Sequence, residues 1–190
     1  MQDIRTRLIE ATFQEVFSNG YTGASLANIL KRADTKKGSM YHHFPSKKDM
    51  VIAMIEEKVE KRIEKKWQVL AQTDKNVITL LISILEDTNS WDLTNGCPLG
   101  NLLQESLNQD EDFAKTLTDI LDKWKKLFCD ALNKAIVLGE IREDVEIEKV
   151  ATFLIASIEG ALLLAKKHQD KKDFEVSIEQ LVFYIHTLKK

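Results

Sequence analysis

Apolar side chains recur every three or four residues along almost the whole chain. This spacing places them on one face of an α-helix, whereas no stretch alternates apolar and polar residues as a half-buried strand does. The pattern predicts helices over these stretches: 3–19, 25–33, about 36–44, 46–70, 74–91, 98–107, a stretch that begins at 110 or 112 and ends at 138, and two more after residue 139. The fold class is therefore predicted to be all-α.

Several residues mark the ends of these helices. Gly20 stands where a C-cap glycine belongs, and Ser25 is a good N-cap because its hydroxyl accepts a hydrogen bond from a free amide of the first turn. Ser46 and Asp49 form an S-x-x-D capping signal, and Asp74 is placed to cap the helix that follows it. These residues divide the chain into consecutive short and long helices.

Residues 25–44 contain two short helices, and the apolar pattern breaks between them over residues 32–35, a join of about three or four residues. In the second helix the larger groups are available to pack inward and the small and basic groups are left to face outward: Met40, Tyr41 and Phe44 inward, and Lys36, Lys37, Ser39 and His42 outward. Gly38 lacks a side chain and lets the backbone approach phosphates closely. Pro45 ends the helix. This arrangement predicts a helix-turn-helix whose second helix enters the DNA major groove.

The first fifty or so residues resemble the DNA-binding domain of TetR-type transcriptional regulators. The resemblance rests on the spacing of eleven positions: Gly20, Tyr21, Ser25, Ile29, Ala33, Lys37, Gly38, Tyr41, His43, Phe44 and Lys47. It implies that one set of side chains approaches the DNA: Lys36, Lys37, Ser39, Tyr41 and His42. It also implies that Lys47 holds a DNA phosphate at the start of the next helix.

The turn of this motif departs from the family pattern. Where the family usually has Gly-Val-Ser, this chain has Asp34, Thr35 and Lys36, which leaves Thr35 as the expected cap of the second helix. The additional positive charge favours contact with phosphates over reading of bases. We therefore assign the DNA-binding site to nine residues: Ser25, Thr35, Lys36, Lys37, Gly38, Ser39, Tyr41, His42 and Lys47.

Charge is divided unevenly along the chain. The formal net charge is −3, but residues 1–50 hold eight Lys or Arg against five Asp or Glu, and the remainder holds nineteen against twenty-five. The first fifty residues are thus net +3 and the rest net −6. A positive segment attracts DNA through its local potential, and an acidic body reduces nonspecific attachment to nucleic acid.

Composition places the chain among ordinary soluble proteins. It has 190 residues, of which 44% are hydrophobic and 30% charged, enough to bury a core in one or two domains. No apolar run is long enough for a membrane span, and the N-terminal segment lacks a signal-peptide core. The two cysteines, Cys97 and Cys129, are too few for a disulfide framework and form no metal motif with the four histidines. We expect a cytoplasmic protein with reduced thiols, no bound metal and no other cofactor.

The last helices carry more apolar residues than one buried stripe needs. Small residues at close-approach spacing occur between Val150 and Ala165, and a second apolar face runs from Ile178 to Leu188. Such surfaces predict a partner, and a second copy of the chain, paired two-fold into a four-helix bundle, is the simplest one. The tail also resembles the TetR-type dimerisation helices, more loosely, in the sequences G-E-I-R and I-E-G-A.

Aromatic residues occur on helices expected to converge in the C-terminal part. With polar groups nearby they could line an apolar pocket for a small-molecule effector, although any one of them is equally a core residue. The candidates are Trp67, Trp91, Cys97, Asn101, Gln104, Glu105, Trp124, Phe128, Phe153 and Ser157. Phe113 is expected in the same aromatic cluster. The pocket as a whole is supported by the family resemblance.

Cys97 lies between Gly96 and Pro98 at a helix start. It is either a small packed side chain or a thiol whose anionic form is stabilised by the helix N-terminus, and a Gly-Cys here resembles TetR-type regulators that respond to electrophiles or oxidants. An enzyme with Cys97 as nucleophile is the alternative from another class, but no recognisable partner motif accompanies the thiol. Alkylation separates the two, since an enzyme loses turnover and a sensor loses operator release.

Together these features predict a three-helix helix-turn-helix domain over residues 1–47 and an effector-binding and dimerisation domain over residues 48–190. The expected function is transcriptional repression, not catalysis: a homodimer binds a palindromic operator in double-stranded DNA and is released by a small-molecule effector. Repression follows from the resemblance alone. A nonspecific DNA-coating protein is a further alternative, and it would show no sequence preference at rising salt.

Overall fold

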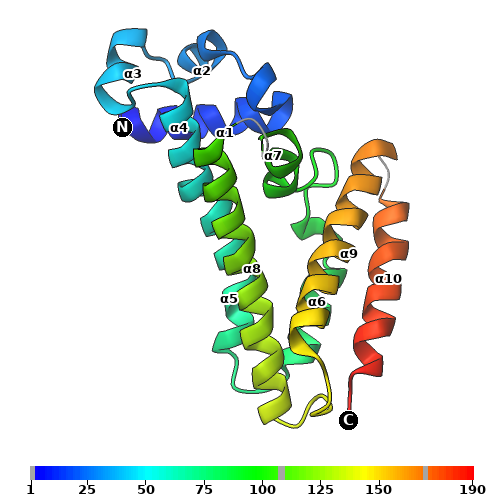
Figure 1. Ribbon diagram of the computed structural model, residues 1–190. Coiled ribbons are helices and arrows are strands. Elements are labelled where there is room, and N and C mark those ends of the chain that lie inside the picture. Colours follow the sequence, from blue (N-terminus) through cyan, green and yellow to red (C-terminus); the bar gives the residue numbers. More distant parts are fainter. Residues whose placement is uncertain (1–2, 107–109, 169–170) are drawn as a thin grey trace. The chain divides into compact units, whose positions relative to one another are not determined.

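The computed structural model describes residues 3–106, 110–168 and 171–190, and within these ranges the chain is helical and has no strand (Figure 1). Its elements are α1 (Ile4–Gly23), α2 (Leu26–Arg32), α3 (Lys37–His43), α4 (Lys47–Met54), the π-helical η1 (Ile55–Glu60), α5 (Lys61–Gln72), α6 (Val77–Glu86), the 3-10 turn η2 (Thr88–Ser90), α7 (Pro98–Ser106), α8 (Glu111–Val137), α9 (Ile147–His168) and α10 (Lys172–Thr187). The predicted all-α fold is confirmed. The predicted end of the helix from residue 98, at residue 107, lies outside the described residues.

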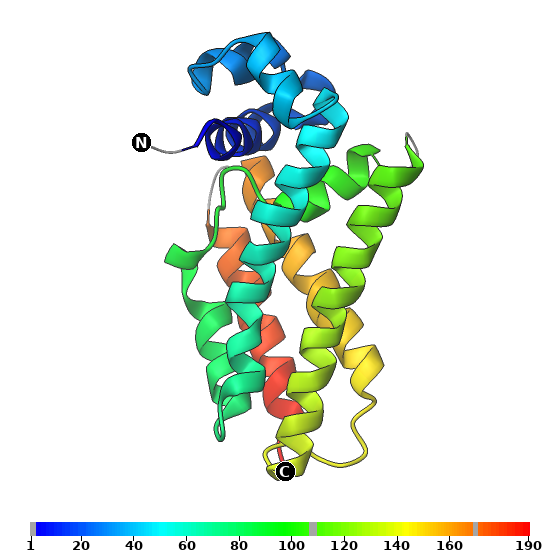
Figure 2. The same cartoon turned by 90° about the vertical axis from the view of Figure 1, so that its left-hand side faces the viewer.

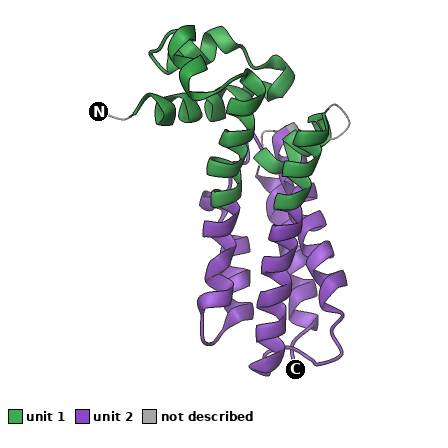
Figure 3. Ribbon diagram, turned by 60° about the vertical axis from the view of Figure 1, so that its left-hand side comes forward, with its two compact units in different colours: residues 1–62, 98–120 green, residues 63–97, 121–190 purple. Residues whose placement is uncertain are grey.

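The chain forms two compact units (Figure 3). Unit 1 comprises residues 1–62 and 98–120, and unit 2 comprises residues 63–97 and 121–190. The backbone therefore passes between the units at three places: at the start of α5, just before α7, and within α8. This grouping differs from the domain boundary expected after Lys47, because α4 and α7 both pack on α1.

Helix α1 is the centre of unit 1. It packs against α2, α3, α4 and α7. The core of the unit includes Leu8 and Ile9 of α1, Ile29 of α2, Met40 of α3 and Met50 of α4, each at most 1% exposed. Burying such a side chain stabilises the fold by about 1.5–3 kcal/mol, and this packing holds short helices that are marginal on their own.

Helices α4 and α5 are joined by the π-helical segment η1. Ile55 and Val59 of this segment are fully buried. On its other side Glu57 forms an ion pair with Arg5 of α1. A π-helical turn contains an extra residue, so it changes the direction in which the side chains that follow it point, and such turns are frequent at functional positions. The long helix expected from Ser46 to about residue 70 is therefore continuous but not a uniform α-helix.

In unit 2, α10 packs along α9 and also contacts α6 (Figure 2). The buried core of this unit includes Trp67, Leu70, Leu81, Leu85, Phe128, Leu132, Leu154, Ile158, Phe174 and Ile178. Within the described ranges, none of the helices combines the length and the apolar character that crossing a membrane requires.

The N-terminus of α6 is capped by a residue far away in the sequence. Both carboxylate oxygens of Glu140 accept hydrogen bonds there, from the amides of Val77 (3.0 Å) and Ile78 (2.9 Å). The expectation that Asp74 caps this helix is wrong, because Asp74 is solvent-exposed and its carboxylate lies 3.9 Å from the Lys134 ammonium. A carboxylate at a helix N-terminus is stabilised by the free amides and by the helix dipole together.

Helix α2 ends in a left-handed turn at Asp34. The φ of Asp34 is 47°, and the amides of Asp34 and Thr35 donate to the carbonyls of Lys31 (3.2 Å) and Leu30 (3.0 Å). This is the Schellman arrangement, in which glycine is the usual residue at the left-handed position. Thr35 does not cap α3, because the N-cap position falls on Lys36, which makes no side-chain capping bond. Thr35 thus belongs to the Schellman motif that ends α2 and does not cap α3.

Replacing Asp34 by Gly should stabilise unit 1. A non-glycine residue in the left-handed region costs about 1–2 kcal/mol, whereas glycine adopts it freely. Asp34 also lies 3.7 Å from Arg7 through a fully exposed side chain, an ion pair of small value. We expect a net gain of about 1 kcal/mol in urea unfolding for Asp34→Gly. Asp34→Ala loses the same ion pair but keeps the strain, so it should be less stable than Asp34→Gly; a loss in Asp34→Gly relative to wild type would show that the side-chain contact with Arg7 outweighs the backbone strain.

Candidate nucleic-acid interface

Helix α3 is anchored by two side chains and exposes the others. Met40 is fully buried and Phe44, the residue after the helix, is 4% exposed. Tyr41 is 50% exposed, so the expectation that it packs inward with Met40 and Phe44 is wrong. The assigned residues of this segment are exposed except for the half-buried Ser39: Lys36, Lys37, Gly38, Tyr41 and His42.

The exposed surface of α3 combines positive charge with an aromatic ring. The Lys37 ammonium lies 5.8 Å from the centre of the Tyr41 ring, one helical turn further along. At Gly38 a Cβ atom would meet no other atom within 4 Å, so the protein's own packing does not require glycine there. Open space beside exposed basic groups suits the close approach of a nucleic-acid backbone.

The start of α2 is held by Ser25 and by a buried acid. The Ser25 hydroxyl accepts a hydrogen bond from the Asn28 amide (3.4 Å), which confirms the predicted N-cap. Glu15 of α1 is only 3% exposed and accepts from the Ser25 amide (3.3 Å) and the Asn28 side chain (2.9 Å). Glu15 was not among the predicted site residues, although an acid on the apolar stripe that includes Leu8 is a signal for such a buried contact.

Lys47 is engaged within the protein. Its ammonium donates to the carbonyls of Tyr21 (2.7 Å) and Ala24 (2.6 Å) and lies 4.7 Å from the centre of the Tyr21 ring. Burial lowers the pKa of Lys47, and the charges of Glu105 and Glu15 oppose this effect. The phosphate contact assigned to Lys47 stays a prediction, while the visible contacts join α4 to the segment that precedes α2.

Four of the predicted effector residues form an aromatic cluster in unit 2. Trp67 is at its centre, with ring-centre distances of 6.0 Å to Trp91, 6.3 Å to Trp124 and 4.7 Å to Phe128. Phe174 of α10 extends the cluster from Trp91 (5.5 Å). Sequence reasoning missed Phe174, whose aromatic side chain was the available signal.

Three buried polar atoms of unit 2 have no hydrogen-bond partner among the described residues: Trp91 Nε1, Trp124 Nε1 and Glu159 Oε1. An unpartnered buried polar group is costly, so such groups are candidates for ligand contact. The Glu159 carboxyl also forms a hydrogen bond with the half-buried Cys97. This partner of the Cys97 thiol is a carboxylic acid, not the base that a nucleophilic thiol needs. Cys129, read as a core residue, is 8% exposed.

The remaining predicted effector residues lie elsewhere. Asn101, Gln104 and Glu105 are on α7, which belongs to unit 1. Phe153 is 46% exposed and packs on Tyr184 of α10 (4.8 Å), so it does not join the aromatic cluster.

Phe113 is also outside the aromatic cluster, because its ring lies against Tyr21 in unit 1 (4.6 Å). Ser157 is half-buried on α9. Over the described part of the chain, no three His, Cys, Asp or Glu side chains are grouped in a way that could hold a metal ion.

Replacing Glu159 by Gln should change how the stability of the protein depends on pH. Burial raises the pKa of Glu159 above its ordinary value of 4.5, and the bond from Cys97 opposes this. Between that ordinary value and the raised one, the unfolded chain ionises first, so the contribution of Glu159 to stability falls as pH rises. Because Gln does not titrate, the stability of Glu159→Gln relative to wild type should rise from about pH 4.5 upward.

Urea unfolding monitored by tryptophan fluorescence measures this, since all three tryptophans lie in unit 2. Glu148→Gln is the matched control. The pKa of Glu148 is lowered, chiefly by its bond with Lys125, so its stabilising effect is present above the ordinary pKa and the variant should show the opposite trend. Parallel curves for wild type and Glu159→Gln would contradict the assignment.

Comparison with known proteins gives the family of this chain. Residues 8–54 match the family model described as "Bacterial regulatory proteins, tetR family", and residues 75–181 match "Tetracyclin repressor-like, C-terminal domain". A regulator of Lactococcus lactis subsp. lactis, an HTH-type transcriptional regulator in the lacX 3' region, is 30% identical over 190 residues, which cover 95% of this chain and 92% of the relative. The HTH-type transcriptional repressor DhaR of Mycobacterium sp. (strain GP1) is 27% identical, with 90% and 87% covered.

Solved structures share the fold. A TetR family regulator from Cytophaga hutchinsonii superposes with a TM-score of 0.87 at 24% identity, covering 97% of this chain and 94% of that one. The reduced form of Escherichia coli NemR gives 0.83 at 24% identity, covering 100% and 98%. The helix-turn-helix of α2 and α3, the matching family models and the relatives over nearly the full length agree. The chain belongs to the tetR family of bacterial regulatory proteins, which are DNA-binding transcriptional regulators.

Proposed function

We propose that this protein is a repressor that binds a palindromic operator as a homodimer and leaves it when a small molecule binds in unit 2. The observation that carries the proposal is the exposed surface of α3, with Lys36, Lys37 and Tyr41 around two buried anchors. Repression is supported by the relatives, since DhaR and NemR are both named as transcriptional repressors.

The operator is read by α3 in the major groove. Lys36 and Lys37 lie at its N-terminus, where positive side chains and free amides suit phosphates, and Tyr41 and His42 lie one turn further along. In a two-fold dimer, two such helices about 34–36 Å apart meet successive turns of one face of the duplex. The operator is then an inverted repeat.

A second copy of the chain is the proposed partner of α9 and α10. Between Lys149 and Lys166 the sequence of α9 contains one charged residue, the half-buried Glu159. The exposed large apolar residues of the two helices are Phe153, Leu163, Leu164, Val176 and Phe183. An exposed surface of this length without charges is unfavourable in water and suits burial against its own two-fold copy.

The effector is proposed to bind at the aromatic cluster of unit 2. Trp67, Trp91 and Trp124 supply apolar surface, and two indole N–H groups there lack a partner among the described residues. A small, mostly apolar molecule with hydrogen-bond acceptors would pack on this surface and accept hydrogen bonds from the two indole groups. Because the tryptophans are confined to unit 2, fluorescence quenching by candidate compounds is a direct assay.

Selection of duplexes from a random pool tests the proposed function, and Tyr41→Ala tests the reading surface. The wild-type chain should enrich an inverted repeat and bind it as two chains. Loss of one groove contact costs about 1–3 kcal/mol, so Tyr41→Ala should weaken binding to the selected duplex by roughly tenfold or more. The far-UV circular dichroism should not change, because Tyr41 is half exposed. Unchanged affinity would remove Tyr41 from the interface.

Phe183→Glu tests the dimer. Phe183 is 68% exposed in the single chain, so a charge there leaves the fold intact but opposes burial in a dimer. The variant should sediment as a monomer and lose tight binding to the selected duplex. Val137→Glu places the same charge at an 84% exposed apolar residue at the end of α8 and should remain dimeric. A dimeric Phe183→Glu would show that the copies meet through another surface.

A further inference from the structure

The backbone that follows the break at Gly20 is held from two sides. Glu105 of α7 accepts hydrogen bonds from the amides of Tyr21 (2.8 Å) and Thr22 (2.7 Å). Lys47 of α4 donates to the carbonyls of Tyr21 (2.7 Å) and Ala24 (2.6 Å). We call residues 20–24 the clamped turn. An acid of one helix and a base of another thus hold the donors and the acceptors of the same short segment.

The backbone at Gly20 makes this contact possible. Its φ of 73° and ψ of 173° interrupt α1, so the amides of Tyr21 and Thr22 begin a new turn and are free to bind a side chain. A Cβ atom at position 20 would lie 2.6 Å from a carboxylate oxygen of Glu105. Glycine is therefore required twice here, by the left-handed conformation and by the approach of the carboxylate.

Glu105 is ionised in this position. Burial opposes its charge, but the hydrogen bonds from Thr22 and Tyr21 and the charge of Lys47 lower its pKa below the ordinary value of 4.5. Both carboxylate oxygens accept at once, one from each amide. An ionised carboxylate offers two equivalent acceptor oxygens and no donor, and bonds of this charge-assisted kind are about twice as strong as neutral ones.

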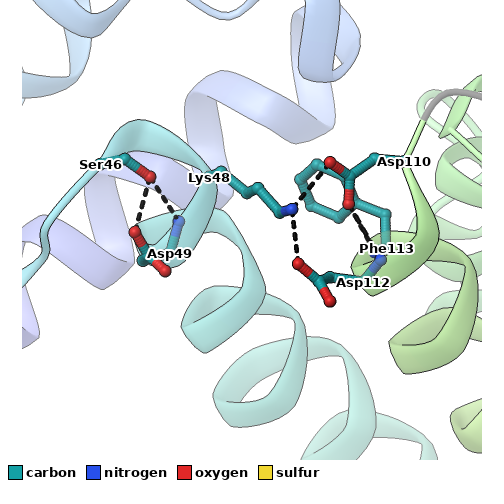
Figure 4. A network of polar contacts seen from close by, with 6 residues as sticks. All are labelled: Ser46, Lys48, Asp49, Asp110, Asp112 and Phe113. Carbon is teal, nitrogen blue, oxygen red and sulfur yellow. Dashed lines mark hydrogen bonds and ion pairs between the residues drawn. The ribbon is translucent and has the colours of Figure 1, made fainter.

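The same helix α4 is tied to the start of α8 by its next residue. The Lys48 ammonium contacts Asp110 (2.7 Å) and Asp112 (2.6 Å), as Figure 4 shows. Asp110 also caps α8 by accepting from the amides of Asp112 (3.0 Å) and Phe113 (3.3 Å). These bonds raise the pKa of Lys48 and lower that of Asp110. The first turn of α4 therefore contacts both the clamped turn, through Lys47, and the start of α8, through Lys48.

The clamped turn leads directly into the helix-turn-helix, since Ser25 caps α2 one residue after it. Helix α7, which carries Glu105, begins at Pro98. The residues immediately before it belong to the segment of unit 2 that contains Trp91 and Cys97. A movement of that segment is therefore passed directly along the backbone to α7, because no other helix lies between them. Glu105 is the side chain through which α7 holds the backbone before α2.

We propose that Glu105 is a positioning residue for DNA binding: its carboxylate holds the clamped turn in the orientation that α2 and α3 need to contact DNA. The inference deepens the proposed function and rests on it. An effector that displaces α7 would withdraw the carboxylate, free the two amides and weaken binding to the operator. This role replaces contact with the effector, which the sequence analysis assigned to Glu105.

Glu105→Gln tests this role with a nearly unchanged side-chain shape. In Gln an NH2 donor takes the place of one carboxylate oxygen, so either the Tyr21 or the Thr22 amide faces a donor and loses its acceptor. Amide hydrogen exchange at these two residues, measured by NMR, should become faster. Affinity for the duplex selected by the wild-type chain should fall about tenfold, within the usual range of coupling between sites. Removing a negative charge would by itself strengthen attraction to DNA, so a loss of affinity reports the lost position.

Two further variants complete the experiment. Glu111→Gln makes the same charge change at an exposed residue of α8 in unit 1 and should bind DNA as tightly as wild type or slightly more tightly. Gly20→Ala places a methyl group against the Glu105 carboxylate and so disrupts the same contact. Its effect on affinity should therefore not add to that of Glu105→Gln. Faster exchange with unchanged affinity in Glu105→Gln would overturn the positioning role alone. A wild-type chain that selects no duplex would overturn the proposed function as well.

Discussion

Free backbone groups at helix ends need partners, and in this chain carboxylates from distant segments supply several of them. The three acids and the amides they bind are Glu15 with Ser25, Glu105 with Tyr21 and Thr22, and Glu140 with Val77 and Ile78. Each acid belongs to a different part of the chain from the helix it holds. Apolar packing brings helices together but tolerates small rotations, whereas hydrogen bonds to fixed amides do not. These contacts therefore add directional restraints at the starts of α2 and α6 and at the last turn of α1.

The helices and their local caps could be predicted because neighbouring residues determine them. Ser25 and the Ser46–Asp49 pair cap their helices as the spacing indicates, and Gly20, with a φ of 73° and a ψ of 173°, interrupts α1 at the position where the pattern places the end of the helix. Caps supplied by residues far away in the sequence have no such local pattern. Asp74 is the correct residue type near α6, yet Glu140 takes its place, since only the tertiary fold brings that acid to the helix. A sequence pattern describes propensity along the chain, and these contacts depend on where other segments return.

The candidate site shows the same division. The exposed basic residues of α3 follow from helical periodicity, but the orientation of Tyr41 does not, because a tyrosine suits both a buried and an exposed position. The aromatic cluster around Trp67 follows from residue type, since large aromatic side chains tend to be buried together. The polar residues of α7 lie apart from it because the backbone enters unit 1 at Pro98. This boundary falls just before α7, and the sequence there does not show which unit the helix joins.

The energy available to an effector limits what it can move. A ligand of micromolar affinity releases about 8 kcal/mol in total, and coupling between sites typically uses about 1–3 kcal/mol of it. Repacking the core of unit 1 around Met40 or Met50 would cost more than this, since losing one such side chain costs about 2–5 kcal/mol. A hydrogen bond to a charged group contributes about 1.5–3 kcal/mol, which is within reach. Under the proposed function, an effector is therefore able to break the contact between Glu105 and the clamped turn, whereas repacking the core of the helix-turn-helix exceeds the energy it has for coupling.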